Sequence, residues 1–282
     1  MKFHVGNSAA PYRSNLPRPG MAAFALLLLV CGLLFPGRLH AADNTPSAVD
    51  RRIRSAEALG VSLYRQDTAA ARATDILFSQ QPDLERHPVL GWVVTGEDSA
   101  PLVTFIGQKG EEYVGQFDVR PGAEEGKRFV LAGGRKLTAE ERARFMARQA
   151  TLPLIPEFCA ENCNSLVLRN PDGTGWLAYW FAASSEPNLI LLGGHTRFTV
   201  SADGGTVLSR DERFSLSRCL TLDKRQKPDN VVGLTVTFSG GDEPVETHVF
   251  LSLYYKMPLY VRTQSGGLWK VENGTVSAAS LP

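Results

Sequence analysis

The longest regular pattern in the sequence is a helical repeat of small and apolar residues between Ser47 and Ser79. The segment opens with Thr45-Pro46-Ser47, and a capping residue beside a proline is typical of a helix N-terminus. The positions that recur at helical spacing are Ile53, Ala56, Gly60, Leu63, Ala70, Ala73 and Leu77. The pattern predicts one long helix or two shorter ones, with any kink at Gly60 or before Asp67.

Short runs of apolar and β-branched residues follow this helix in quick succession. The first four runs lie at 89–94, 101–106, 112–119 and 128–131. Turn residues separate them, among them Gly96 and Gly110. Closely spaced runs of this kind predict an antiparallel meander.

A second helix is predicted after the meander. Thr138-Ala-Glu-Glu141 is a capping box, in which the side chains of Thr138 and Glu141 each accept a hydrogen bond from the other's backbone N–H. The helix carries an apolar stripe of small residues and Met146, and Pro153 and Pro156 end it.

Nearly all of the C-terminal half is predicted to form strands. The runs lie at 164–168, 176–183, 189–192, 196–200, 206–208, 213–222, 232–238, 247–255, 259–262 and 269–271. The aromatic run 176–181 predicts a central strand that packs on both faces, and Asn273-Gly274 is a strong hairpin signal. We therefore expect an α+β fold, with the N-terminal and central helices packed on a mainly antiparallel sheet. A division into two sub-domains near residue 152 stays open.

Residues 1–42 have the layout of a secretory signal peptide. Three basic residues and no acidic residue precede an apolar run from Met21 to Phe35. That run is shorter than the roughly 20 residues that cross a bilayer as a helix, and small residues at Ala41 and Ala42 fit a cleavage site. We expect a cleaved leader and a periplasmic or secreted domain of residues 43–282, with an uncleaved N-terminal anchor as the alternative.

The charge balance argues against nucleic acid as a partner. The chain has 30 basic and 29 acidic residues, and four of the basic ones but none of the acidic ones lie in the leader, which leaves residues 43–282 with a net charge of −3. Nucleic-acid-binding domains concentrate positive charge instead. Since no second apolar run approaches membrane-spanning length, we expect no membrane contact after the leader is removed.

Three cysteines follow the leader: Cys159, Cys163 and Cys219. In an oxidising compartment an odd number of cysteines indicates one disulfide and one remaining thiol. We expect Cys163 to pair with Cys219, because Cys163 opens a strand-like run; Cys159 is the alternative partner. Such a bridge closes a loop of about 55 to 60 residues and stabilises by roughly 3 to 4 kcal/mol on the chain-entropy model.

His195 is the strongest candidate for acid–base chemistry in the sequence. It follows Gly193-Gly194, which allows the backbone to approach another group closely, and imidazole titrates near neutral pH. Asp67 and Asp75 fall on nearly one face of the first helix and are the candidate carboxylate partners. We favour structural roles: a His with local hydrogen bonds, and a solvated charged helix face. A cleft with His195 in hydrogen-bond reach of a carboxylate would instead favour an enzyme.

The sequence lacks signatures of a metal, a cofactor or an activated nucleophile. Cys159, Cys163, Cys219 and His195 are ligand types that zinc prefers, but their spacing is poor and export favours oxidation of the thiols. No phosphate-binding loop, nucleophile elbow, metalloprotease helix or EF-hand loop occurs. We expect neither a cofactor nor a metal.

Taken together, the sequence favours an exported, non-catalytic binding or accessory protein of the cell envelope. Its partner would be an unidentified small molecule or an envelope protein. Because no catalytic signature occurs, we lean away from an enzyme. Two alternatives stay open: an envelope hydrolase that uses His195 with an Asp partner, and a protein-interaction module of the inhibitor or immunity type.

Overall fold

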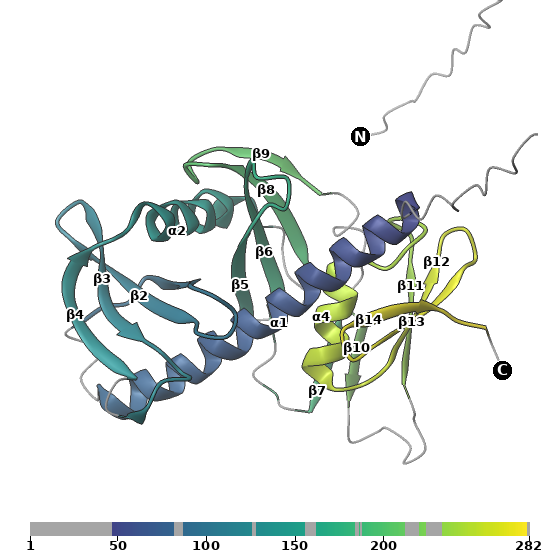
Figure 1. The fold of residues 1–282 in the computed structure, drawn as a ribbon, viewed down its shortest axis with the longest axis horizontal. Helices are drawn as coiled ribbons and strands as arrows, with labels where there is room; N and C mark the ends of the chain where they lie inside the picture. Colours follow the sequence, from purple (N-terminus) through teal and green to yellow (C-terminus); the bar gives the residue numbers. More distant parts are fainter. Residues whose placement is uncertain are drawn as a thin grey trace, which may run out of the picture. The chain divides into compact units, whose positions relative to one another are not determined.

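The computed structural model describes residues 47–81, 87–125, 128–155, 162–183, 186, 188–211, 220–223 and 233–280. These residues form a mixed α+β fold with three α-helices and mostly antiparallel strands (Figure 1). None of the helices found there is both long and apolar enough to span a membrane. The leader, Cys159 and Cys219 lie outside the described residues, so leader cleavage and the disulfide stay predictions.

Helix α1 (Ala48–Gln80) runs without a break through the segment that the helical repeat predicts. The hydroxyl of Ser47 accepts a hydrogen bond from the N–H of Asp50 at 3.1 Å, and the Asp50 carboxylate accepts one from the N–H of Ser47 at 3.0 Å. Gly60 is not a helix break. A Cβ on Gly60 would lie 2.5 Å from the Cβ of Val249, so glycine is required there for a close helix–helix contact.

The first sheet is the predicted antiparallel meander. It consists of β1 (Gly91–Thr95), β2 (Leu102–Lys109), β3 (Glu112–Val119) and β4 (Phe129–Lys136), paired in that order. The C-terminal half of α1 covers it with small residues. The buried side chains of this cluster are Ala69, Ala70, Ala73, Leu77, Val94, Val103, Phe105, Phe117 and Val119. Alanines at the contact allow the helix to lie close to the sheet.

Helix α2 (Ala139–Thr151) begins at the predicted capping box and continues into a 3₁₀ turn, Leu152–Leu154, that contains Pro153. It packs on two sheets at once. Phe145 contacts the first sheet, and Ala143 and Ala147 contact the second. Helix α2 therefore holds the two sheets together.

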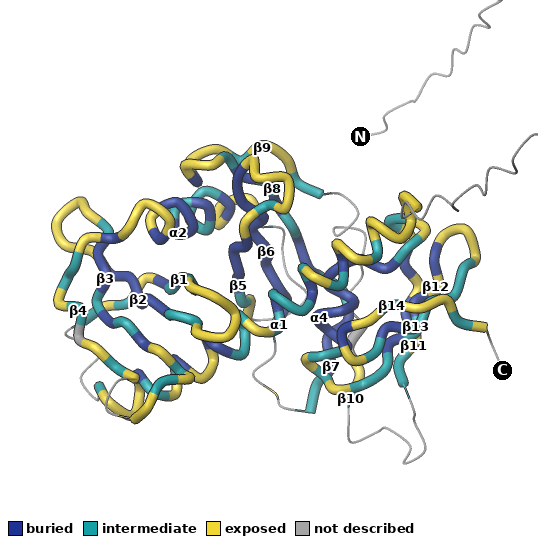
Figure 2. The backbone as a smooth tube through the Cα atoms, in the orientation of Figure 1, coloured by how far each residue is buried: buried dark blue, intermediate teal, exposed yellow. Residues whose placement is uncertain are grey.

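The second sheet has the order β5-β6-β8-β9 and is antiparallel throughout. Its strands are β5 (Asn162–Arg169), β6 (Gly175–Ala183), β8 (Thr196–Ser201) and β9 (Val207–Arg210). As the aromatic run predicts, β6 is a central strand that is buried on both faces, and it is dark blue along its length in Figure 2. The first sheet ends at Lys136 and the second begins at Asn162, while a sub-domain division near residue 152 stays a prediction.

The rest of the C-terminal half is mostly strands. A two-stranded pair joins β7 (Leu189–Leu192) to β10 (Leu220–Asp223). The third sheet contains β11 (Leu234–Phe238), β12 (Leu259–Thr263), β13 (Leu268–Glu272) and β14 (Thr275–Ala278). The predicted Asn273-Gly274 turn joins β13 to β14, with φ angles of 52° and 85° that suit these two residue types.

The strand predicted at 247–255 is wrong, because this segment is helix α4 (Glu246–Tyr255). The helix crosses over between β11 and β12, which is why these two strands are parallel. Residues 246–252 are all buried, polar and apolar alike, so the sequence of this segment lacks an amphipathic period. His248 thus lies in the first turn of a helix, where its Nδ1 accepts a hydrogen bond from the N–H of Val245 at 3.0 Å.

The largest core cluster lies where the N-terminal half of α1 meets α4, the second sheet and the third sheet. Leu63 of α1, Val249 and Phe250 of α4, and Tyr179 and Phe181 of β6 belong to it. Helix α1 therefore contributes to two cores, one on each side of its midpoint. Asp67 lies on α1 between these two cores.

Candidate functional site

A cavity of about 140 Å³ lies where α1, the second sheet, β7 and α4 come together. The lining residues that carry its chemistry are Asp67, Asn164, Phe181, His195, Phe250 and Tyr254. The fold thus brings together His195 and Asp67, which are 128 positions apart in the sequence. It does not bring Asp75 to the same place.

His195 lies in the connection from β7 to β8 and its side chain is buried, with 5 % relative exposure. Gly193 and Gly194 precede it with φ angles of 97° and 71°, a conformation that favours glycine. The local hydrogen bond that we expected for His195 does not occur, because neither ring nitrogen has a partner among the described residues. Its imidazole instead lies beside the ring of Phe181, with 5.3 Å between the centroids.

The imidazole of His195 is neutral at physiological pH. Burial, together with the smaller effect of the nearby His248, lowers the pKa of His195 to about 3. A neutral imidazole carries one donor and one acceptor nitrogen. Burying these groups without hydrogen bonds costs roughly 1 to 3 kcal/mol for each group.

Asp67 is half-buried in the wall of the cavity. Its Oδ1 accepts a hydrogen bond from Nδ2 of Asn164 at 2.7 Å, and Oδ1 of Asn164 accepts one from the N–H of Ser165 at 2.9 Å. The backbone contact fixes the orientation of the Asn164 amide, which in turn positions Asp67. Burial raises the pKa of Asp67 to about 6, although the Asn164 hydrogen bond acts in the opposite direction.

Two tyrosines of α4 complete the wall. Burial raises the pKa of Tyr254, and the charge of Asp67 raises it further, which indicates that the two groups lie near each other. The hydroxyl of Tyr255 accepts a hydrogen bond from the N–H of Leu191 at 2.8 Å. This contact ties β7 to α4 on one side of the cavity.

Asp75 is exposed and does not line the cavity. It lies eight positions after Asp67 on α1, which corresponds to about 12 Å along a helix. A shared helix face therefore does not mean a shared environment here. The solvated interpretation fits Asp75, whereas Asp67 is buried enough for its pKa to shift.

The described residues provide no metal centre, since no group of three or more His, Cys, Asp and Glu side chains among them is placed to hold an ion. Cys163 is exposed at the start of β5 and forms no disulfide within the described ranges. The other members of the proposed cysteine set, Cys159 and Cys219, lie outside those ranges.

The aromatic wall that α4 supplies was not predicted from the sequence. Phe250 and Tyr254 lie in the segment that we predicted as a strand, so their approach to Asp67 could not be foreseen. Helix-end signals were present nonetheless: Glu246 stands in the first turn, and Pro258 follows the last turn.

A second, larger cavity of about 300 Å³ lies between the N-terminal part of α1 and the start of α4. The charged residues that border it are paired with one another. Arg52 forms an ion pair with Glu243, and Arg197 forms one with the buried Glu246. The hydroxyl of Tyr179 also donates a hydrogen bond to Glu246 at 2.8 Å. The charges at this cavity therefore serve the fold.

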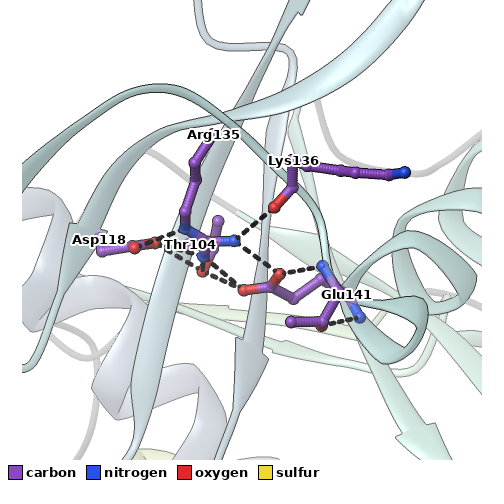
Figure 3. A network of polar contacts seen from close by, with 6 residues as sticks. Thr104, Asp118, Arg135, Lys136 and Glu141 are labelled. Carbon is purple, nitrogen blue, oxygen red and sulfur yellow. Dashed lines mark hydrogen bonds and ion pairs between the residues drawn. The ribbon is translucent and has the colours of Figure 1, made fainter.

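A separate polar network lies between the first sheet and α2 (Figure 3). The guanidinium of Arg135 donates to both oxygens of Asp118 at 2.7 Å each, and to Glu141 at 2.6 and 2.9 Å. The hydroxyl of Thr104 lies within 3.0 Å of all three groups. Glu141 also accepts the N–H of Thr138 at 2.8 Å, so the capping box and the ion pairs share one carboxylate.

This network gives every buried charge a partner. Burial alone would raise the pKa of Glu141, but the Arg135 guanidinium, the N–H of Thr138 and the hydroxyl of Thr104 together lower it to about 2. The hydrogen bonds to Glu141 and Asp118, and then the charges of these carboxylates, raise the pKa of Arg135. The network therefore joins β2, β3, β4 and α2, and its groups have no remaining need of a ligand.

Among the described residues, the His195 cavity is the best candidate site. It offers a carboxylate, a neutral imidazole and aromatic rings, yet no hydrogen bond joins His195 to Asp67. The cavity thus contains the histidine and the carboxylate that would have favoured an enzyme, but not the hydrogen bond between them. Comparison with protein-family models, with curated protein sequences and with solved structures finds no match to this chain, so the site is interpreted from its own residues.

Proposed function

We propose that this chain is an exported, non-catalytic binding protein that holds a small molecule in the cavity beside His195 and Asp67. The observation that supports the proposal is the buried His195, whose ring nitrogens have no partner among the described residues although the residue borders a cavity. Buried polar groups in folded proteins are nearly always hydrogen-bonded. A ligand with a hydrogen-bond donor or acceptor would satisfy a ring nitrogen of His195, and this hydrogen bond would add to the affinity of the ligand.

The size of the cavity limits the ligand. An engineered cavity of about 150 Å³ in another protein holds benzene, which makes the 140 Å³ here suitable for a single ring or a short branched chain with one polar group. Phe181 and Phe250 supply apolar surface, while His195 and Asp67 supply polar contacts. Sites of this composition, apolar walls with a few polar groups, are typical of small-molecule binding.

An envelope hydrolase receives less support from this geometry. A histidine acts as a general acid in its doubly protonated form, and burial lowers the pKa of His195 to about 3, so its ring lacks that second proton near neutrality. A base is most effective when its pKa lies near the working pH and when a third group orients it. His195 has no such orienting hydrogen bond among the described residues.

Export and one disulfide are part of the same proposal. The leader-like segment 1–42 supports secretion, and the exposed position of Cys163 at the start of β5 leaves its sulfur accessible for a bridge to Cys219. Free-thiol counting by mass spectrometry on the unreduced exported protein tests the bridge. One reactive thiol agrees with a single closed pair, whereas three would rule the disulfide out.

Binding can be tested by NMR of histidine rings in the exported protein. The ring signal of His195 should shift when a set of single-ring fragments with cationic, neutral and anionic head groups is added at millimolar concentration. His87 is the internal control, because its ring contacts Phe117 of the first sheet and should not respond. The variant His195→Phe assigns the signal. If no fragment moves it, the proposed function is wrong.

A further inference from the structure

We infer that the ligand of this cavity is a small organic cation, an amine on a ring-sized apolar body, whose ammonium group lies against Asp67. This inference rests on the proposed function and narrows it to one chemical class.

The described lining of the cavity carries the negative charge of Asp67 and includes neither lysine nor arginine. An anionic ligand would therefore meet repulsion from Asp67. A cation would meet attraction in a partly enclosed space, where charges interact more strongly than in bulk water.

Asp67 is a carboxylate that lacks a cationic partner. No ion pair joins it to a described lysine or arginine, and its hydrogen bond to Nδ2 of Asn164 comes from a neutral amide. Its other described neighbour, Tyr254, is neutral as well. This contrasts with Glu141 and Glu246, which are also buried and are both paired with arginines. The raised pKa of Asp67 agrees with an ionised form that has no counter-charge.

The apolar side of the site consists of aromatic rings in contact with one another. The ring centroids of Phe181 and Phe250 are 4.6 Å apart, and those of Phe250 and Tyr254 are 5.6 Å apart. Aromatic faces attract ammonium groups as well as apolar surface. A ring-bearing amine therefore matches the wall with its ring and the carboxylate with its charge, and the neutral His195 can accept one N–H.

Three probes of similar size separate charge from shape: benzylamine, benzyl alcohol and benzoate. Titration calorimetry on the exported protein at pH 7 should show benzylamine binding at least about tenfold more tightly than benzyl alcohol, with benzoate the weakest. A charge-assisted hydrogen bond is roughly twice as strong as a neutral one, which makes this ranking the expected one. Equal affinities for benzylamine and benzyl alcohol, or tighter binding of benzoate, would overturn the amine class.

The pH dependence in the wild-type protein gives a second readout that needs no mutation. Since the pKa of Asp67 is about 6, the ionised fraction falls about tenfold from pH 7 to pH 5, and benzylamine affinity should fall by about the same factor. His195 and His248, with pKa values of about 3 and 4, stay neutral across this interval. Benzyl alcohol affinity should change little. A flat profile for benzylamine would count against Asp67 as its contact.

The variant Asp67→Asn keeps the shape of the side chain and removes its charge. It should reduce the preference for benzylamine over benzyl alcohol to less than about threefold, while Asp75→Asn, an exposed change on the same helix, should leave the preference intact. A benzylamine preference that survives Asp67→Asn overturns the inference. The proposed function still stands if any probe shifts the His195 signal, and it falls together with the amine class only if none does.

Discussion

The protein treats buried polar groups in two different ways. In the network around Arg135, every charge has a geometrically suitable partner, and the groups lie between a helix and a sheet. Around His195, a buried ring has no described partner, a half-buried carboxylate has only an amide, and the two residues border an open volume. The polar groups of the first region satisfy one another, whereas those of the second are only partly satisfied by described residues.

The difference separates structural from functional use of polar residues. A satisfied buried network fixes the geometry of the elements that it joins, and its individual members cannot be removed without leaving charges unpaired. An unsatisfied group lowers stability and persists where it has another use. Mutations in the two regions should therefore have effects of opposite sign on the free energy of unfolding.

The largest effect is expected when the centre of the network is removed. Arg135→Leu leaves Asp118 and the nearly inaccessible Glu141, which has 2 % relative exposure, without their cation. Breaking a buried pair in this way costs about 3 to 5 kcal/mol, because the remaining charge stays buried. Urea unfolding followed by circular dichroism measures the loss.

The matched control for this variant is Arg142→Leu, which changes an exposed arginine of α2. Surface changes of this kind stay within about 0.5 kcal/mol. If Arg135→Leu costs as little as the control, the network has no structural role and the contrast between the two regions disappears.

A smaller loss is expected for Glu141→Gln, which keeps the size of the side chain but removes its charge. Hydrogen bonds to charged groups are worth about 1.5 to 3 kcal/mol, and the variant weakens those from Arg135 and Thr138. The folded-state pKa of Glu141 is lowered to about 2, so its contribution is present above about pH 4.5 and is lost as pH falls toward 2.

The difference in unfolding free energy between wild type and Glu141→Gln should therefore shrink as the pH is lowered from 7 to 3. The change Glu112→Gln, at an exposed position on β3, is the control and should show no comparable trend. A difference that stays constant down to pH 3 would contradict a lowered pKa for Glu141.

More of the Arg135 network than of the His195 cavity could be predicted from the sequence, and the reasons are physical. The Thr138–Glu141 half of the network is a local motif, three residues apart, and could be predicted from spacing alone. Arg135 and Asp118 meet only through the register of the β3–β4 pairing, with its irregularity between Gly115 and Phe117, which a single sequence does not specify. The meander, α1 and the Asn273-Gly274 hairpin were predicted because their signals are also local.

The cavity depended on elements whose signals are not local. His195 and Asp67 were recognised individually as candidates, but their common environment requires α4, whose mostly buried sequence resembles that of a strand. Asp67 and Asp75 looked equivalent on the helix face. They differ because Asp67 lines the cavity with residues of α4 and β5, whereas Asp75 does not line it. Tertiary contacts, rather than periodicity, decided which aspartate belongs to the site.

Replacing His195 should raise the free energy of unfolding, whereas the changes in the Arg135 network lower it. His195→Phe replaces a buried ring that lacks described partners by an apolar ring of similar shape, and should stabilise the ligand-free protein by about 1 kcal/mol at pH 7. The difference in unfolding free energy between His195→Phe and wild type should increase as the pH falls. Because the folded-state pKa of His195 is lowered to about 3 from an ordinary value of 6.5, wild type loses stability as pH falls below about 6.5, while the variant lacks this contribution.

Between pH 7 and pH 5 the wild type should lose about 2 kcal/mol more than His195→Phe, at about 1.4 kcal/mol for each pH unit below 6.5. His248 and Asp67 also titrate differently in the folded and unfolded chains, His248 in the same direction as His195 and Asp67 in the opposite one. Both are present in wild type and variant, so their contributions cancel in the comparison. A variant that is less stable than wild type at pH 7 would show that the ring nitrogens of His195 have partners within the protein, and the cavity would then lose the feature that sets it apart from the Arg135 network.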